Sequence, residues 1–388
     1  MMETPEHVVV LVHGTFAQDA TWMRADSPFC RTLKETLRSV AIHPFQWSGK
    51  NSHSARLRAA DRLAGFLNDQ LAAHPHAQHH VVAHSHGGNV VLYALRDSDL
   101  RAAVASVVFL GTPFISVSRR NIDSTVAALK YAVPAGLSIP WTIAGSLFVA
   151  DTVRLAAHPN FGAGAAVLAV LLFGALFTAL AFLGRWWLRY VGHTLLQRLK
   201  HRQQALVDKL SLPPLDAAPL YAVRARRDEA AAYLRGLDRV ASIPFRLWHP
   251  TGIAWFIASA TILVVAFFAY VAFRPEGGVA KDLWESLSGL AFFIAAAPLA
   301  AALIFVLTAL VFQGLMIVWT GVFRGHALGF GDRIFENWLV HVASEDRPPG
   351  GRVKDEEIAL AGNGLRHSLL YQDPNVAQAV AGWLRNPV

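Results

Sequence analysis

Short runs of β-branched and aliphatic residues recur along this chain at the length of buried strands. Most are followed at once by turn residues and then by apolar positions at helical spacing. Buried strands that alternate with helices predict an α/β fold with a mostly parallel sheet flanked by helices. The runs assigned to strands are His7 to Val12, Val81 to Ala83, Ala103 to Leu110, Leu220 to Ala225 and Asn337 to Ala343.

The stretch VVAHSHGG, residues 81 to 88, predicts a strand that turns sharply into a helix. A helical pattern follows directly, over Asn89 to Arg96, so Ser85 stands at the apex of the turn. Such a turn holds the serine in a strained conformation with its hydroxyl above the sheet edge. It also needs small neighbours, which Gly87 and Gly88 supply. The sequence therefore predicts a nucleophilic serine at position 85.

Three motifs in this order resemble the lipase-like branch of the α/β-hydrolase superfamily. HGTF follows the first strand at residues 13–16, HSHGG forms the sharp turn at 84–88, and LGTP follows the next strand at 110–113. One departure is Ala83, which stands where the family usually has a glycine. The resemblance covers residues 1 to about 114 and resumes in two later pieces. It implies an α/β-hydrolase fold and hydrolysis of carboxylic esters, with no cofactor and no metal.

The resemblance also implies which residues surround the reacting group. One oxyanion donor is expected to be the backbone N–H of Thr15 or Phe16, and the other that of His86, which follows the serine. The residues expected near an acyl pocket are Phe16, Trp47, Asn51 and Phe114. Ordinary turn chemistry explains Trp47 and Asn51 equally well.

In this family the acid and the histidine follow the serine in that order. Asp228 stands between the run Leu220 to Ala225 and a helical pattern, so it is the expected acid. Glu229 is its nearest competitor, and a helix N-cap is the alternative role for Asp228. If Asn337 to Ala343 is the last strand, the loop after it carries His367. These positions predict that His367 accepts the serine proton while Asp228 fixes the imidazole tautomer.

The composition is more apolar than that of an ordinary soluble enzyme. Hydrophobic residues make up 54% of the 388 residues, charged residues only 16%, and the mean hydropathy is +0.35. Four segments carry no charge at all, and about 20 predominantly apolar residues suffice to cross a bilayer. A sheet that carries all three catalytic residues requires an even number of crossings in each insert. We therefore expect two transmembrane helical hairpins, with spans at about 131–150 and 161–184, and at about 251–273 and 287–319.

These hairpins divide the chain into five segments. Residues 1–114, 191–248 and 324–388 are expected to form the hydrolase core, while 115–190 and 249–323 are the inserts. The alternative is a soluble enzyme whose long helical cap buries the apolar segments. The one cysteine, Cys30, excludes an intrachain disulfide.

Charge predicts how the chain is oriented in the membrane. Between positions 185 and 202 there are five basic residues and no acidic one. Since positive residues gather on the cytoplasmic side, the catalytic domain is expected to face the cytoplasm, as an integral protein of the bacterial inner-membrane type. The net charge of +8 suits anionic lipid headgroups, and no nucleic-acid recognition motif is present.

Together these patterns predict a membrane-embedded serine hydrolase that cleaves carboxylic esters, with lipid esters as the expected substrates and the lipid bilayer as its partner. Two alternatives stay open: a tethered thioesterase or small-ester hydrolase, and an inactive membrane interaction protein on a hydrolase fold. A histidine-rich patch, His74, His76, His79 and His80, is interpreted as a solvated loop rather than a metal site.

Overall fold

The computed structural model describes residues 4–123, 163–215, 218–247, 311, 314–316, 318–323, 339–350, 353–360 and 365–387. The chain falls into two compact units. The first comprises Met1–Arg120, Gln203–Ser242 and Val318–Val388, and the second comprises Asn121–Arg202 and Ile243–Ile317. All of the predicted site residues belong to the first unit.

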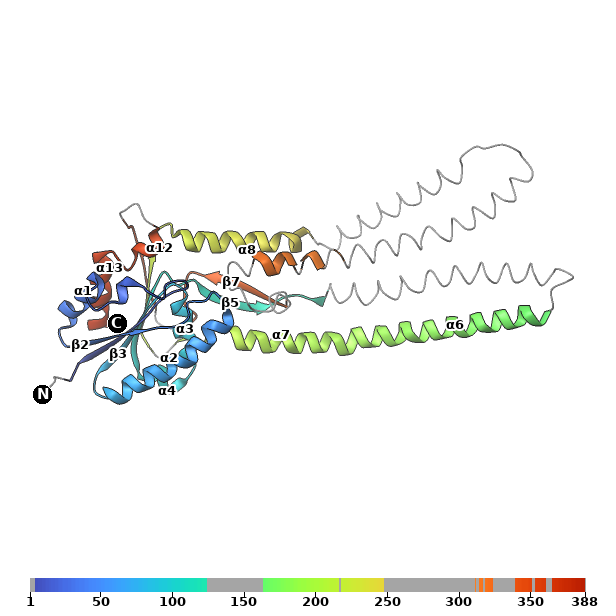
Figure 1. The fold of residues 1–388 in the computed structure, drawn as a ribbon, viewed down its shortest axis with the longest axis horizontal. Helices are drawn as coiled ribbons and strands as arrows, with labels where there is room; N and C mark the ends of the chain where they lie inside the picture. Colours follow the sequence, from blue (N-terminus) through green and yellow to red (C-terminus); the bar gives the residue numbers. More distant parts are fainter. Residues whose placement is uncertain are drawn as a thin grey trace, which may run out of the picture. The chain divides into compact units, whose positions relative to one another are not determined.

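The first unit is built on a six-stranded sheet in the order β2-β1-β3-β4-β6-β8, in which every neighbouring pair is parallel (Figure 1). This confirms the predicted parallel α/β fold. Its strands are β1 (His7–Val12), β2 (Val40–Phe45), β3 (Gln78–His84), β4 (Val104–Leu110), β6 (Leu220–Ala225) and β8 (Val353–Ile358). A separate antiparallel pair joins β5 (Phe114–Arg119) to β7 (Val340–Glu345).

Helices cover both faces of this sheet, so its central strands can be apolar on both sides. On one face α1 packs against α13, and on the other α3 contacts β1, β3 and α2. As a result, every residue from Val8 to Val12 is at most 1% exposed. The helices are α1 (Pro28–Leu37), α2 (His53–Ala73), α3 (Gly87–Ala94), α4 (Ser98–Ala103), α8 (Glu229–Leu247), α12 (Arg366–Leu369) and α13 (Pro374–Arg385), with a 3-10 turn η1 (Thr21–Met23).

The strand that precedes the loop of His367 differs from the one expected. The described residues of the stretch 337–343 do not supply it, because in the part of the chain that the structure describes β7 pairs only with β5, outside the main sheet. The last sheet strand is β8, whose sequence VKDEEI has no apolar pattern. This strand tolerates its charges because it lies at the sheet edge, where two of its carboxylates have partners on β6. Arg224 pairs with Asp355, and the Tyr221 hydroxyl donates to Glu356 at 2.6 Å.

The histidine-rich patch is also placed differently from the prediction. His79 and His80 belong to β3 and are 3% and 0% exposed, so they do not form a solvated loop. His80 bridges two neighbours, with ring nitrogens 2.9 Å from the Ser106 hydroxyl and 3.1 Å from the His7 ring. These hydrogen bonds satisfy the polar atoms of His80 inside the sheet and explain why it can be buried.

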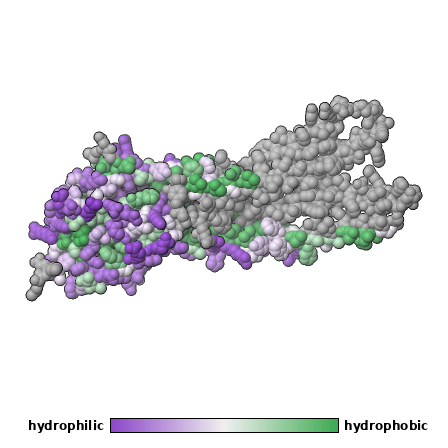
Figure 2. All heavy atoms as spheres, viewed as in Figure 1, coloured by the Kyte–Doolittle hydropathy of each residue, from purple (hydrophilic) through white to green (hydrophobic). Residues whose placement is uncertain are grey.

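In the second unit, α6 (Ala163–Arg189) continues through a π-helical turn, Tyr190–Leu195, into α7 (Leu196–Leu210), whose residues from Gln203 on belong to the first unit. Figure 2 shows hydrophobic side chains along α6. Its large exposed apolar residues are Val167, Leu168, Leu171, Leu172, Phe182, Leu183 and Trp186.

The expected span 161–184 coincides with α6, but no helix in the described ranges has the length and sustained hydropathy that a bilayer crossing requires. That finding does not support a crossing there. The expected spans 131–150 and 251–273, and most of 287–319, lie outside the described residues. The two transmembrane hairpins therefore stay a prediction.

Candidate active site

Ser85 lies where β3 ends and α3 begins, in the sharp turn that the sequence predicts. Its φ of 53° falls in the left-handed region, which is strained for a residue with a side chain. Two backbone hydrogen bonds hold this conformation. The Ser85 N–H donates to the Leu110 carbonyl at 2.9 Å, and the Ser85 carbonyl accepts from the Gly88 N–H at 3.0 Å.

The loop after β1 crosses this turn so closely that only glycine fits. A Cβ on Gly87 would lie 2.5 Å from the carbonyl oxygen of His13, and a Cβ on Gly14 would lie 2.7 Å from the Cβ of Ser85. Both distances are far below a van der Waals contact, so the two glycines bring the HGTF loop against the serine.

His367 and Asp228 meet as the sequence predicts. His367 is on α12, Asp228 is between β6 and α8, and the Nδ1 of His367 is 2.8 Å from Oδ2 of Asp228. The other oxygen, Oδ1, accepts the N–H groups of Ala230 and Ala231 at 2.9 and 3.2 Å. The N-cap role and the histidine partner role, which stood as alternatives, are both present because each uses a different oxygen.

The electrostatics of Asp228 favour its carboxylate form. Burial by itself opposes ionisation, but the hydrogen bond and charge of His367, with the two backbone N–H donors, lower the pKa of Asp228 below its ordinary value. At neutral pH the group beside His367 is therefore an acceptor, and the Nδ1 of the imidazole is the atom that donates to it.

Two further residues hold the segment of His367, and the sequence did not assign this role to either. Glu229 accepts the backbone N–H of Arg366 at 2.9 Å. His84 donates from Nε2 to the carbonyl of His367 at 3.1 Å, and the two rings lie 4.8 Å apart. Burial is the main cause that lowers the pKa of His84, to about 3, so its ring is neutral. The carboxylate of the competitor Glu229 thus contacts the residue before His367, and not the imidazole.

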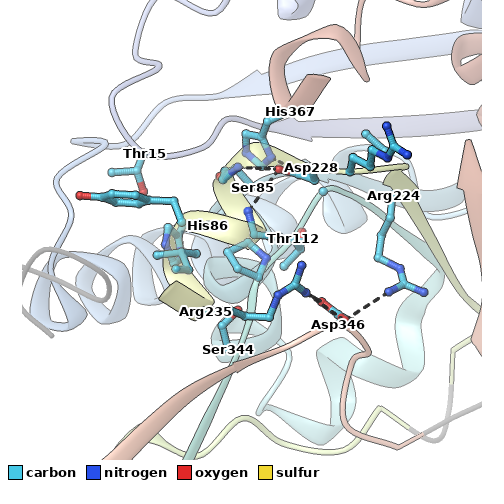
Figure 3. Close-up of a pocket in the computed structure, with 18 of the residues that line it drawn as sticks. Thr15, Ser85, His86, Thr112, Arg224, Asp228, Arg235, Ser344, Asp346 and His367 are labelled. Atoms are coloured by element: carbon cyan, nitrogen blue, oxygen red, sulfur yellow. Dashed lines mark hydrogen bonds and ion pairs between the residues drawn. The ribbon is translucent and has the colours of Figure 1, made fainter. Parts of the chain in front are cut away.

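One cavity of about 390 Å³ in the first unit is lined by residues of the HGTF loop, the Ser85 turn, β6, α8 and α12 (Figure 3). Ser85, Asp228 and His367 line it together. The expected residues Thr15, Phe16, Asn51 and His86 line it as well. The chain thus brings three predicted catalytic residues and four other predicted site residues to the same space, which is the size of a typical small-molecule site.

Hydrogen bonds distinguish the two expected donors on the HGTF loop. The Phe16 N–H already donates to the carbonyl of Gly49 at 2.9 Å, so it is committed elsewhere. Within the ranges that the structure describes, the N–H groups of Thr15 and His86 have no protein acceptor. Thr15 and His86 are therefore the pair whose donors are available to a substrate oxygen.

Trp47 and Phe114 do not line the cavity, contrary to the expectation for an acyl pocket. Trp47 is 3% exposed and stacks on His13, to whose carbonyl its indole Nε1 donates at 2.8 Å. Phe114 is 2% exposed and packs edge-on against Phe109. Both rings are used as packing groups, Trp47 beneath the HGTF loop and Phe114 at the start of β5.

The cavity also has a charged wall that the sequence analysis missed. It contains Arg224 from β6, Arg235 from α8, and Ser344 and Asp346 at the end of β7. No motif connects these residues, because they come from three elements far apart in the sequence. Their common place became apparent only from the fold. Among the described residues, no group of three or more histidine, cysteine or acidic side chains has the geometry of a metal site.

Comparisons with known proteins add little to this geometry. No family model matches the chain, and no curated protein matches it. Among solved structures, the chain is similar to the crystal structure of a metagenomic carboxyl esterase, with 17% identity over 61% of this chain and a TM-score of 0.26. The match spans 56% of the length of that esterase.

Proposed function

We propose that this protein is a serine hydrolase of the α/β-hydrolase type that cleaves carboxylic esters. One observation carries the proposal: the 2.8 Å hydrogen bond between His367 and Asp228, in the same cavity as a serine with a left-handed φ at a strand–helix turn. An N-cap aspartate alone does not require a histidine partner, and a structural turn does not require a strained serine. The combination matches what nucleophilic catalysis by serine needs.

The proposed reaction follows from these contacts. Because the Nδ1 of His367 donates to Asp228, its Nε2 is free to accept the proton of Ser85 as the hydroxyl oxygen attacks the acyl carbon. The oxyanion that forms accepts from the N–H groups of Thr15 and His86. The intermediate collapses to acyl-Ser85, and His367 returns the proton to the leaving alcohol. Water then repeats the sequence, releasing the carboxylic acid and restoring the serine.

The cavity supports an ester with a sizeable apolar part. Its lining includes the apolar side chains of Phe16, Pro113 and Leu234 and the ring of Tyr233. Phe16 is 83% exposed although its φ of 59° is strained, so the chain holds an aromatic ring out at the cavity at an energetic cost. This apolar side favours acyl chains over small acetyl groups, and we propose lipid esters as the substrates.

Membrane embedding is part of the same proposal and rests on the sequence. The uncharged segments 131–150, 161–184, 251–273 and 287–319 and the basic stretch 185–202 are its support. We propose that the catalytic unit faces the cytoplasm beside a bilayer that supplies its substrates.

An active-site probe tests the proposed activity directly. A fluorophosphonate with a fluorescent tag should label the detergent-extracted protein at Ser85, and Ser85→Ala should abolish the labelling. Labelling at another residue, or none in a protein with an intact thermal transition, would contradict the proposal and favour an inactive hydrolase fold.

The kinetics of the nucleophile and base provide a second measurement. Ser85→Ala or His367→Ala should lower kcat on a 4-nitrophenyl ester by roughly 10⁴- to 10⁶-fold, and the double variant should be little worse, because the two residues act as one unit. If Ser85→Ala retained a tenth of the wild-type activity, Ser85 would not be the nucleophile.

A further inference from the structure

The charged wall of the cavity is a connected set of ion pairs. Arg235 donates from Nη1 to both oxygens of Asp346, at 2.9 and 3.2 Å, and Nη1 of Arg224 lies 3.7 Å from the same carboxylate. Figure 3 shows Arg224 and Arg235 converging on Asp346, apart from Ser85, Asp228 and His367. Two guanidinium groups thus share one carboxylate inside the cavity that holds the proposed nucleophile.

The two arginines are not held equally. Arg224 is fixed by Asp355, with Nε 3.1 Å from Oδ1 and Nη2 2.5 Å from Oδ2, and only 28% of its side chain is exposed. Arg235 has Asp346 as its one acceptor in the described ranges, and both side chains are about half exposed, at 47% and 52%. Because exposed ion pairs contribute little to stability, the pair of Arg235 and Asp346 is easily exchanged.

We infer that this end of the cavity is a subsite for an anionic group, a carboxylate or a phosphate, on the part of the ester that does not react. The incoming anion replaces Asp346 on the guanidinium of Arg235, with Arg224 beside it and the Ser344 hydroxyl in the same wall. The inference rests on the proposed ester hydrolysis and narrows its substrates to esters that carry a negative charge.

The subsite favours an anion through its hydrogen-bond donors and not through net charge, because Arg224 and Arg235 face the carboxylates of Asp346 and Asp355 and the lining also contains Arg227 and Glu357. A guanidinium presents a planar pair of donors that matches the oxygens of carboxylate and phosphate groups. Arg224 and Arg235 already bind Asp346, so both would repel a cationic substrate that approached this carboxylate. An anion meets the same two arginines and displaces a carboxylate that can turn to solvent.

Matched esters test the inference through KM. The substrates are the 4-nitrophenyl esters of butyrate, succinate and 4-aminobutyrate, which are neutral, anionic and cationic at the far end, and an ester with a terminal phosphate. Arg235→Gln should raise KM for the anionic esters about 10-fold, the loss of one charge-assisted hydrogen bond, and leave KM for the neutral ester within about twofold. Asp346→Asn should lower KM for the anionic esters, because it removes the competing carboxylate. If KM rises more for the succinate ester with Arg235→Gln, the subsite fits a carboxylate. If it rises more for the phosphate ester, the subsite fits a phosphate.

The control is Arg239→Gln, which removes an exposed arginine one turn along α8 that does not line the cavity. It should leave KM unchanged for all four esters, which separates contact with the substrate from the net charge of the protein. Equal effects of Arg235→Gln on neutral and anionic esters, or a preference for the cationic ester, would overturn the subsite. If no ester is hydrolysed and Ser85 is not labelled by the probe, it is the proposed function that fails.

Discussion

At the scale of single residues, the two oxygens of Asp228 serve different elements. Oδ2 accepts a hydrogen bond from Nδ1 of His367, while Oδ1 caps the first turn of α8 by accepting the N–H groups of Ala230 and Ala231. Any substitution of Asp228 therefore changes both the contact with His367 and the cap of α8, and an informative variant must separate the two effects. Asparagine does so, because its amide oxygen can still cap the helix but carries no charge to fix the imidazole tautomer.

We predict that Asp228→Asn lowers kcat by roughly 10⁴-fold, the effect of a wrong tautomer in a serine triad, while the free energy of unfolding changes little. Steady-state kinetics and urea unfolding of the same preparation measure the two effects. A fall in kcat no larger than the fraction of protein that unfolds would show that Asp228 acts only as a cap.

The matched control is the neighbouring acid. Glu229→Gln keeps an oxygen that can accept the N–H of Arg366, so turnover should stay within a fewfold of the wild type. The opposite ranking of the two variants would move the catalytic acid to Glu229.

At the scale of elements, the contact between the loop after β1 and the start of α3 depends on a missing side chain. A Cβ on Gly87 would meet two backbone oxygens, those of His13 at 2.5 Å and Val12 at 2.8 Å, and backbone cannot yield as a flexible side chain does. The strand, the loop that carries Thr15 and the turn of Ser85 would all have to shift.

Gly87→Ala should therefore reduce activity by at least about 100-fold, the typical cost of a displaced oxyanion donor, and should lower the unfolding midpoint. Gly65→Ala on α2 is the control: nothing lies within 4 Å of the added methyl group, so it should stabilise the protein by about 0.5–1 kcal/mol. Thermal unfolding and ester kinetics of both variants test this, and full activity in Gly87→Ala would refute the close approach.

Buried histidines make the sheet sensitive to acid. Burial is the main cause that lowers the pKa of His80 to about 3, and the same holds for His84. Since an unfolded histidine titrates near 6.5, the unfolded chain binds more protons than the folded one between about pH 3 and pH 6.5. The stability is therefore complete above pH 6.5 and is lost progressively as the pH falls through this window.

We predict that the free energy of unfolding falls between pH 7.5 and pH 5.0, by about 2 kcal/mol for each such histidine. His80→Gln should remove about that amount of the pH dependence, and the same substitution at the exposed residue His76 is the matched control. Urea unfolding at the two pH values measures both. An equal slope in the wild type and His80→Gln would show that His80 is not the group that titrates.

At the scale of the whole molecule, the chain leaves the first unit twice and returns to it. The first unit contains three stretches of sequence, interrupted by the two stretches that form the second unit. In this first unit Ser85 lies before both interruptions, Asp228 between them and His367 after them. If the interruptions cross a membrane, each must return to the side from which it left.

Reporter cysteines test this topology. Cys30 is fully buried, so single cysteines can be introduced into the wild-type background. In intact cells an impermeant maleimide should label Ala157→Cys and Gly278→Cys at the predicted hairpin tips. It should label the exposed positions Ala205→Cys and Gln378→Cys only after the membrane is opened. Opposite sides for these last two would break the parity argument, and a protein that is soluble without detergent would contradict membrane embedding.

The chain's local patterns determined the elements that carry the predicted triad. The strands β1 and β6, the turn at Ser85 and the final helix are each encoded by a short continuous stretch of sequence, because strand burial and sharp turns place local demands on residue type. Asp228 was predicted from its place after β6, whereas His367 was predicted from its place after residues 337–343, which are not the strand that precedes its loop. Strand β8 was missed because its sequence is charged, and the partners of its carboxylates on β6, Arg224 and Tyr221, are distant in sequence.

What only the tertiary structure decided is which atoms meet. The sequence left Thr15 and Phe16 equivalent, and the hydrogen bond from Phe16 to Gly49 separates them. The sequence placed Trp47 and Phe114 at the pocket. In the structure they are buried away from it, Trp47 against His13 and Phe114 against Phe109. The charged wall of Arg224, Arg235 and Asp346 has no local signature at all. Periodicity and turn chemistry act between neighbours in the chain, whereas a hydrogen bond or ion pair depends on distances that exist only once the sheet has assembled.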